Sequence, residues 1–75
     1  MEIKIVTEDR VGLLRDISAV FSRSRLNIFE VNTKENGKFP IVKIICSALS
    51  EDKAKKFLVK LKKLREIREL DHRLL

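Results

Sequence analysis

Two runs of β-forming residues lie on either side of Asn36 and Gly37, near the middle of the 75-residue chain. An Asn-Gly pair between such runs is the strongest short-range signal of a tight β-hairpin. The runs, residues 27–35 and 39–48, are therefore expected to form two neighbouring antiparallel strands. Pro40 cannot donate a ladder hydrogen bond, so it is expected at the start of its strand or on a sheet edge. Any fold of this chain must contain a central hairpin.

A helical pattern flanks the hairpin on each side. The first apolar stripe consists of Leu13, Ile17, Val20 and Phe21, with Leu14 on its flank. The second consists of Ala54, Phe57, Leu58, Leu61 and Leu64. Spacings of three and four place each set on one face of a helix. Ser50 precedes two acidic residues and is the expected N-cap of the second helix. Before the first helix, residues 2–7 alternate charged and apolar side chains, which predicts a half-buried strand.

The segment after Leu64 leaves two alternatives open. Ile67, Leu70 and Leu74 continue the helical spacing without an intervening Gly or Pro, so the second helix could run to the C-terminus. The other reading is a short last strand near residues 67–72. The preceding order, β-α-β-β-α, packs two helices on one face of an antiparallel sheet. With a last strand, the fold is an α+β, ferredoxin-like βαββαβ sandwich.

The size of the chain predicts a single domain spanning residues 1–75. A chain this short buries only about 60% of its unfolded surface, so its core is marginal and dimerisation is a natural supplement. No apolar run approaches the roughly 18 residues that a membrane span needs, and the start of the chain has no signal-peptide core. We expect a cytoplasmic protein, or one domain cut from a longer chain, without membrane association.

The residues typical of catalytic and metal sites are scarce. Cys46 is the single cysteine, lies among apolar residues and lacks the partners of a zinc or redox motif, so it is expected in the core. His72 is the single histidine and is expected to be a solvated or strand residue. The sequence shows no nucleophile–base constellation, no P-loop and no H-E-x-x-H motif. We therefore expect no enzyme, no metal site and no cofactor.

The segment DRVGLLRDISAVFSRSRLNI, residues 9–28, resembles the first half of the ACT domain. Members of that family commonly show an acidic residue or Asn, then Arg-x-Gly-hydrophobic-Leu, a helix, and an Asn-Ile pair opening the second strand. The matching positions are Asp9, Arg10, Gly12, Leu13, Leu14, Asn27 and Ile28. The resemblance covers residues 3–34 well and extends over the hairpin to residue 48. It is most similar to the C-terminal ACT domain of bacterial (p)ppGpp synthetase/hydrolase enzymes.

This resemblance implies a regulatory domain that binds an amino acid and forms a homodimer. Such a domain would stand alone or belong to a larger or partner enzyme, such as a (p)ppGpp synthetase of the stringent response. In the family, the ligand lies at the interface between two domains. Carried over by position, the turn side of the site is Asp9, Arg10, Val11, Gly12, Leu13 and Leu14. The same transfer places Asn27 and Ile28 near the ligand, at the start of the second strand.

The chemistry of these residues suits an amino acid. Gly12 lets the backbone approach a ligand, and N–H groups at a helix start can receive a carboxylate. Asp9 could accept the α-ammonium group, while Val11, Leu13 and Leu14 supply an apolar wall. With no second charge expected nearby, the ligand should be small and apolar. The alternative is purely structural, because aspartate and glycine are also ordinary turn residues.

Two other functions compete with amino-acid binding. The formal net charge is +6, and Lys53, Lys56, Lys60 and Lys63 follow one another at helical spacings. These lysines could bind nucleic acid, for example on a ribosome, although the chain lacks Trp and Tyr for stacking on bases. A charged outer stripe is also the normal complement of an amphipathic helix. The third possibility is an oligomerisation module without a ligand.

Overall fold

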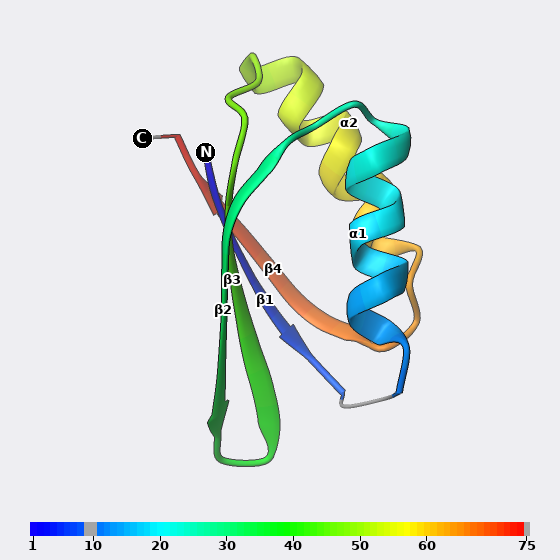
Figure 1. The fold of residues 1–75 in the computed structure, drawn as a ribbon, viewed down its shortest axis with the longest axis vertical. Helices are drawn as coiled ribbons and strands as arrows, with labels where there is room; N and C mark the ends of the chain where they lie inside the picture. Colours follow the sequence, from blue (N-terminus) through cyan, green and yellow to red (C-terminus); the bar gives the residue numbers. More distant parts are fainter. Residues whose placement is uncertain (9–10, 75) are drawn as a thin grey trace.

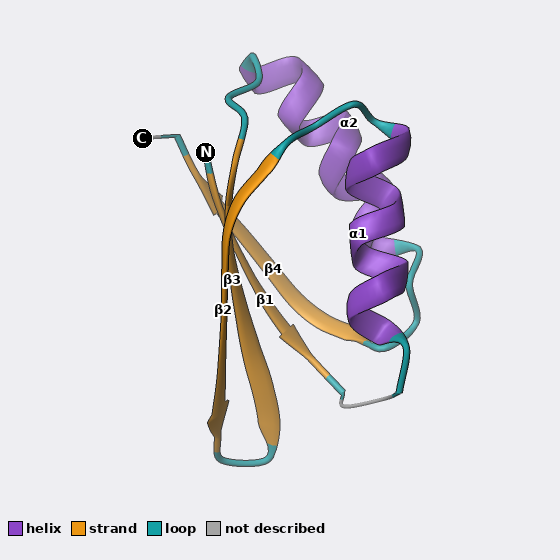
Figure 2. Ribbon diagram, in the orientation of Figure 1, coloured by secondary structure: helices purple, strands orange, loops and turns teal. Residues whose placement is uncertain are grey.

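Two helices pack on one face of a four-stranded antiparallel sheet in the computed structural model (Figure 1; Figure 2). The structure describes residues 1–8 and 11–74, with only the backbone of Asn36. The elements are β1 (Glu2–Thr7), α1 (Leu13–Arg23), β2 (Ile28–Asn36), β3 (Phe39–Cys46), α2 (Glu51–Lys62) and β4 (Ile67–Arg73). The strand order is β2-β3-β1-β4. The ferredoxin-like fold expected from the sequence is confirmed.

The central hairpin forms, but its loop lies one residue later than the Asn-Gly pair. Asn36 pairs with Phe39, which leaves Gly37 and Lys38 as the two loop residues. Gly37 has a φ of 77°, a left-handed conformation that favours glycine. Pro40 lies near the start of β3, just beyond Ile41, where the pairing with β1 ends. The missing N–H of this proline therefore removes no bond between β3 and β1.

The C-terminal segment is a strand, which resolves the two alternatives left by the sequence. β4 pairs with β1, and a bulge inserts Arg68 between the residues opposite Thr7 and Val6. Because of that extra residue, Ile67 and Leu70 point to the same face although they are three positions apart. Both contribute to the core. A spacing of three is ordinarily a helical signal, and here a β-bulge produces it.

The core lies between the helices and the sheet. Ile3 from β1 and Ile44 from β3 are fully buried in it. The rings of Phe21 and Phe57 meet edge to face with centroids 4.7 Å apart, which joins α1 to α2. Cys46 is buried, as expected from its neighbours. Ser50 caps α2 as predicted, its Oγ accepting the N–H of Lys53 at 3.4 Å.

Helix α1 ends at Arg23 through a backbone motif. The N–H of Leu26 donates to the carbonyl of Phe21, and the N–H of Arg25 donates to that of Ser22, each at 3.0 Å. Arg25 has a φ of 58°, in the left-handed region that glycine usually occupies after a helix. These two bonds define a Schellman motif, and buried Leu26 completes it by packing in the core beside Phe21.

Strand β2 is an edge strand with unusually little cover. The described side chains from Phe29 to Glu35 are all exposed, including 68% of Phe29 and 41% of Val31. The β2–β3 hairpin also projects beyond the N-terminal end of α1 (Figure 1). An edge strand of this length presents unpaired backbone groups to which another strand can pair.

Within residues 1–8 and 11–74, neither helix is long and apolar enough to cross a membrane.

Candidate functional site

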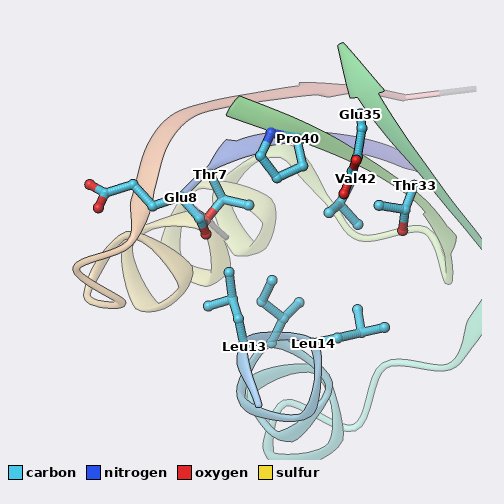
Figure 3. Close-up of a pocket in the computed structure, with 9 residues that line it drawn as sticks. Thr7, Glu8, Leu13, Leu14, Thr33, Glu35, Pro40 and Val42 are labelled. Carbon is cyan, nitrogen blue, oxygen red and sulfur yellow. The ribbon is translucent and has the colours of Figure 1, made fainter. Parts of the chain in front are cut away.

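A pocket of about 140 Å³ lies between the start of α1 and the projecting part of the β2–β3 hairpin (Figure 3). The lining residues come from the end of β1, the first turns of α1, and both hairpin strands. They are Thr7, Glu8, Leu13, Leu14, Ile17, Thr33, Glu35, Pro40 and Val42. The pocket is thus apolar towards the core and carries polar groups at the end of β1 and on β2.

The start of α1 forms one wall of this pocket. Gly12 is the N-cap, with a φ of 84° and a ψ of −3°, a left-handed conformation. As a glycine it provides no side-chain hydrogen bond to the first turn. The first N–H groups of a helix have no partner within that helix, and they carry a partial positive charge. Leu13 is buried beneath them, whereas 47% of Leu14 is exposed towards the hairpin.

Only some of the predicted turn residues line the pocket. Leu13 and Leu14 line the pocket, and Gly12 directly precedes them. Val11 is 98% exposed and does not line it. Asp9 and Arg10 lie outside the residues that the structure describes.

The other two predicted residues lie at the opposite end of α1. The eleven residues of this helix span about 16 Å, at 1.5 Å per residue. The backbone N–H of Asn27 donates to Ser47 Oγ at 3.0 Å, which ties the start of β2 to the end of β3. Ile28 pairs with Cys46 and packs against the core. Within one chain, Asn27 and Ile28 are therefore separated from the pocket.

Two carboxylates at the pocket overturn the expectation that no second charge would be nearby. Glu8 is paired with Arg68 at 3.1 Å, and that guanidinium lies 4.6 Å from the centre of the Phe39 ring. Glu35 has no ion-pair or hydrogen-bond partner among the described side chains. Sequence reasoning missed Glu35 because only the hairpin register, opposite Pro40, brings it over α1. Continuing the alternation Val31, Thr33 along β2 would have put it on the same face.

Thr7 has a structural role at the edge of the pocket. Its hydroxyl contacts the carbonyl oxygens of Glu66 at 2.9 Å and Glu8 at 3.1 Å, and its side chain is buried. These contacts fasten the end of β1 to the turn before β4. The hydroxyl hydrogen is therefore already engaged within the protein.

The predicted lysines belong to α2 and its C-cap, and none of them lines this pocket. Lys53, Lys56 and Lys60 line a separate groove, whereas Lys63 is the C-cap of the helix and does not line it. His72 is half-buried, with its Nε2 3.4 Å from Glu51 Oε1. No group of three or more His, Cys, Asp or Glu residues within the described chain is arranged to hold a metal ion.

Comparisons with solved structures find the same fold in several other proteins. The ACT domain from GTP pyrophosphokinase of Chlorobium tepidum matches with a TM-score of 0.75 and 23% identity, over 93% of this chain and 91% of that chain. The acetolactate synthase small subunit from Thermotoga maritima matches with a TM-score of 0.77 and 15% identity, over 93% of this chain and 44% of that chain. A homoserine dehydrogenase from Thiobacillus denitrificans matches with a TM-score of 0.75 and 16% identity, over 91% and 15% of the two chains.

The family assignment rests on sequence as well as on fold. A comparison with curated protein sequences found no match. The family model of the ACT domain, however, matches residues 1–71. ACT domains are regulatory ligand-binding domains, and the solved structures above include a domain of the kind of enzyme to which the sequence resemblance pointed. The chain belongs to the ACT domain family.

Proposed function

We propose that this ACT domain is a non-catalytic regulatory module that binds a small apolar amino acid and works as a homodimer. The observation that carries the proposal is the pocket at the start of α1. There an apolar wall lies between the first turn of a helix and the carboxylate of Glu35. A ligand with one negative group, one positive group and an apolar side chain matches these three features.

Each part of such a ligand has a partner of suitable chemistry. The α-carboxylate would meet the N–H groups of the first turn of α1, which the helix dipole favours. The α-ammonium group would pair with Glu35, and the side chain would pack against Leu13 and Leu14. An engineered cavity of about 150 Å³ accepts benzene. A pocket of about 140 Å³ therefore suits a branched aliphatic side chain.

A second copy would bring Asn27 and Ile28 to the ligand. If two β2 edges pair antiparallel around a two-fold axis near Asn32, the start of one strand meets the end of the other. Thr33 and Glu35 of one copy then face the beginning of β2 of the second copy. The exposed apolar side chains of Phe29 and Val31 would be covered by the same pairing. Dimerisation and ligand binding would thus share one interface.

This domain would regulate an enzyme either as part of the same longer chain or by binding to it as a separate protein. The matched structures include a subunit named for acetolactate synthase, and a homoserine dehydrogenase of which this chain covers 15%. The similarity to an ACT domain from a GTP pyrophosphokinase supports a role in the stringent response. We place the protein in the cytoplasm, where such enzymes and free amino acids occur.

Ligand binding is tested by calorimetry with leucine, isoleucine, valine and serine. We expect the branched-chain amino acids to bind more tightly than serine. N-acetyl-leucine, which lacks the ammonium group, and isopentylamine, which lacks the carboxylate, should each bind at least about tenfold more weakly, because each loses a charge-assisted hydrogen bond. If no amino acid binds at millimolar concentration, the domain is an oligomerisation module without an amino-acid ligand.

Dimerisation is tested separately with two matched valine variants. Val31→Glu places like charges near the proposed two-fold axis, whereas Val59→Glu makes the same change at an exposed position of α2. Sedimentation should show a dimer for the wild type and for Val59→Glu, and a monomer for Val31→Glu. A wild-type monomer at micromolar concentration, or dissociation of both variants alike, would refute the β2 interface.

A further inference from the structure

A second groove, of about 210 Å³, lies where the C-terminal end of α1 meets α2. It is lined by Ser24, Leu49, Lys53, Lys56, Phe57 and Lys60. The three lysines lie at spacings of three and four, on one side of α2, and their side chains are exposed. Half-buried Leu49 supplies apolar surface to the groove, whereas Phe57 is almost wholly buried. The groove is separated from the amino-acid pocket by the length of α1.

The charge of this groove is uncompensated. None of the lining residues is acidic, and none of the three lysines has an ion-pair partner in the described part of the chain. Between Lys53 and Lys63 the sequence contains six lysines and no Asp or Glu. Arg23 and Arg25 flank Ser24 along the chain and are also exposed. Like charges gathered around a concave surface attract a multivalent anion.

A buried hydroxyl group provides a second and independent observation. Ser24 Oγ is buried and has no hydrogen-bond partner among the described residues. The nearby carbonyls of Val20, Phe21 and Ser22 already accept the N–H groups of Ser24, Leu26 and Arg25. Buried polar groups without partners are uncommon and ask for an explanation. Ser24 also lines the groove, so a small shift of its side chain would let the hydroxyl donate to an anion bound there.

We propose that this groove binds a small organic phosphate with two or more phosphate groups on a compact body. Lysine binds phosphate as a mobile point charge, and three ammonium groups offset most of the charge of a diphosphate or triphosphate. Ser24 Oγ would donate to a phosphate oxygen, and the body would rest on Leu49. A concave groove with a buried donor favours a small molecule over a nucleic-acid strand. Phe57, only 3% exposed, offers no stacking surface.

Two triple variants of the same helix separate a site from general charge. Lys53→Gln/Lys56→Gln/Lys60→Gln removes the groove lysines, whereas Lys55→Gln/Lys62→Gln/Lys63→Gln removes three lysines that do not line it. Calorimetry measures the affinity of each variant for ATP and for pyrophosphate, at a physiological ionic strength of about 0.15 M. We expect roughly a hundredfold loss in the first variant and less than about threefold in the second.

Ser24→Ala tests the site without changing its charge. Affinity for pyrophosphate should fall about fivefold or more, while thermal stability without ligand should not decrease, since the hydroxyl has no partner to lose. Equal losses in both triple variants would overturn the proposal. So would the absence of binding at millimolar ATP and pyrophosphate, or tighter binding of a short RNA than of ATP. Because the leucine titration concerns the other end of α1, either proposal can fail while the other holds.

Discussion

At Gly12, both the backbone geometry and the proposed ligand site depend on the absence of a Cβ atom. Its φ of 84° is a conformation that a residue with a Cβ adopts only at a cost of roughly 1–2 kcal/mol. The same conformation directs the chain from β1 into the first turn of α1. A structural role for this glycine is therefore established by the backbone alone, whatever binds beside it.

A pair of substitutions measures that structural role. Gly12→Ala should lower the free energy of unfolding by about 1–2 kcal/mol in urea denaturation, whereas Gly12→Asn should lower it less, because asparagine tolerates the left-handed region. If alanine is as stable as glycine here, the turn does not require a left-handed residue. A ligand assay on Gly12→Asn, rather than on a β-branched variant, then keeps the effects on folding small.

Because of Cys46, the free energy of unfolding should fall as the pH rises into the alkaline range. Burial raises the pKa of its thiol above its ordinary value, and the positive charge of the chain's amino terminus partly opposes this rise. A raised folded-state pKa stabilises the protein fully below the unfolded pKa, about 8.5, and the contribution is lost as pH rises through the folded value. Between pH 8 and pH 10, the free energy of unfolding of the wild type should fall more than that of Cys46→Ala. Parallel urea titrations of the two proteins would show this, and equal slopes would contradict it.

At the scale of elements, the end of α1 holds a non-glycine residue in a left-handed conformation, and a substitution can relieve that strain. The two backbone bonds of its Schellman motif need a left-handed residue at position 25, where the chain has arginine instead of glycine. Arg25→Gly should therefore raise stability by about 1 kcal/mol, seen as a higher melting temperature. Arg23→Gly, in the last helical turn, is the matched control and should lower stability by a similar amount. If both variants are destabilised, Arg25 contributes contacts that outweigh its backbone strain.

The elements were predictable where local pattern and tertiary packing agree. The apolar stripe from Leu13 to Phe21 fixed α1, and Ser50 fixed the start of α2, because caps and helical faces are local properties. The last strand was ambiguous because Ile67 and Leu70 share a face through a bulge that only the pairing with β1 creates. The pocket was predictable on its α1 side and not at Glu35. The position of Glu35 depends on the register of the hairpin, which places it opposite Pro40 only once the chain has folded.

At the scale of the whole molecule, stability should depend on protein concentration. A chain of this length has a marginal core, and one long edge strand exposes apolar side chains. If dimerisation covers that edge, dilution favours the less stable monomer, and the melting temperature should fall by several degrees over a hundredfold dilution. Val31→Glu should abolish this dependence and Val59→Glu should retain it. A wild-type melting temperature that is independent of concentration would argue for a domain that is stable as a monomer.

The first and last strands are neighbours in the sheet, with Glu2 opposite Arg73 and both chain ends on one side of the molecule (Figure 1). Tension applied through the two ends therefore acts at the open end of the β1–β4 ladder. It peels the hydrogen bonds one after another instead of shearing them all together. Peeling removes β4 and exposes Ile67 while the β2–β3 hairpin remains paired. A domain built this way should therefore unfold at a small pulling force when it is held by the two strands β1 and β4.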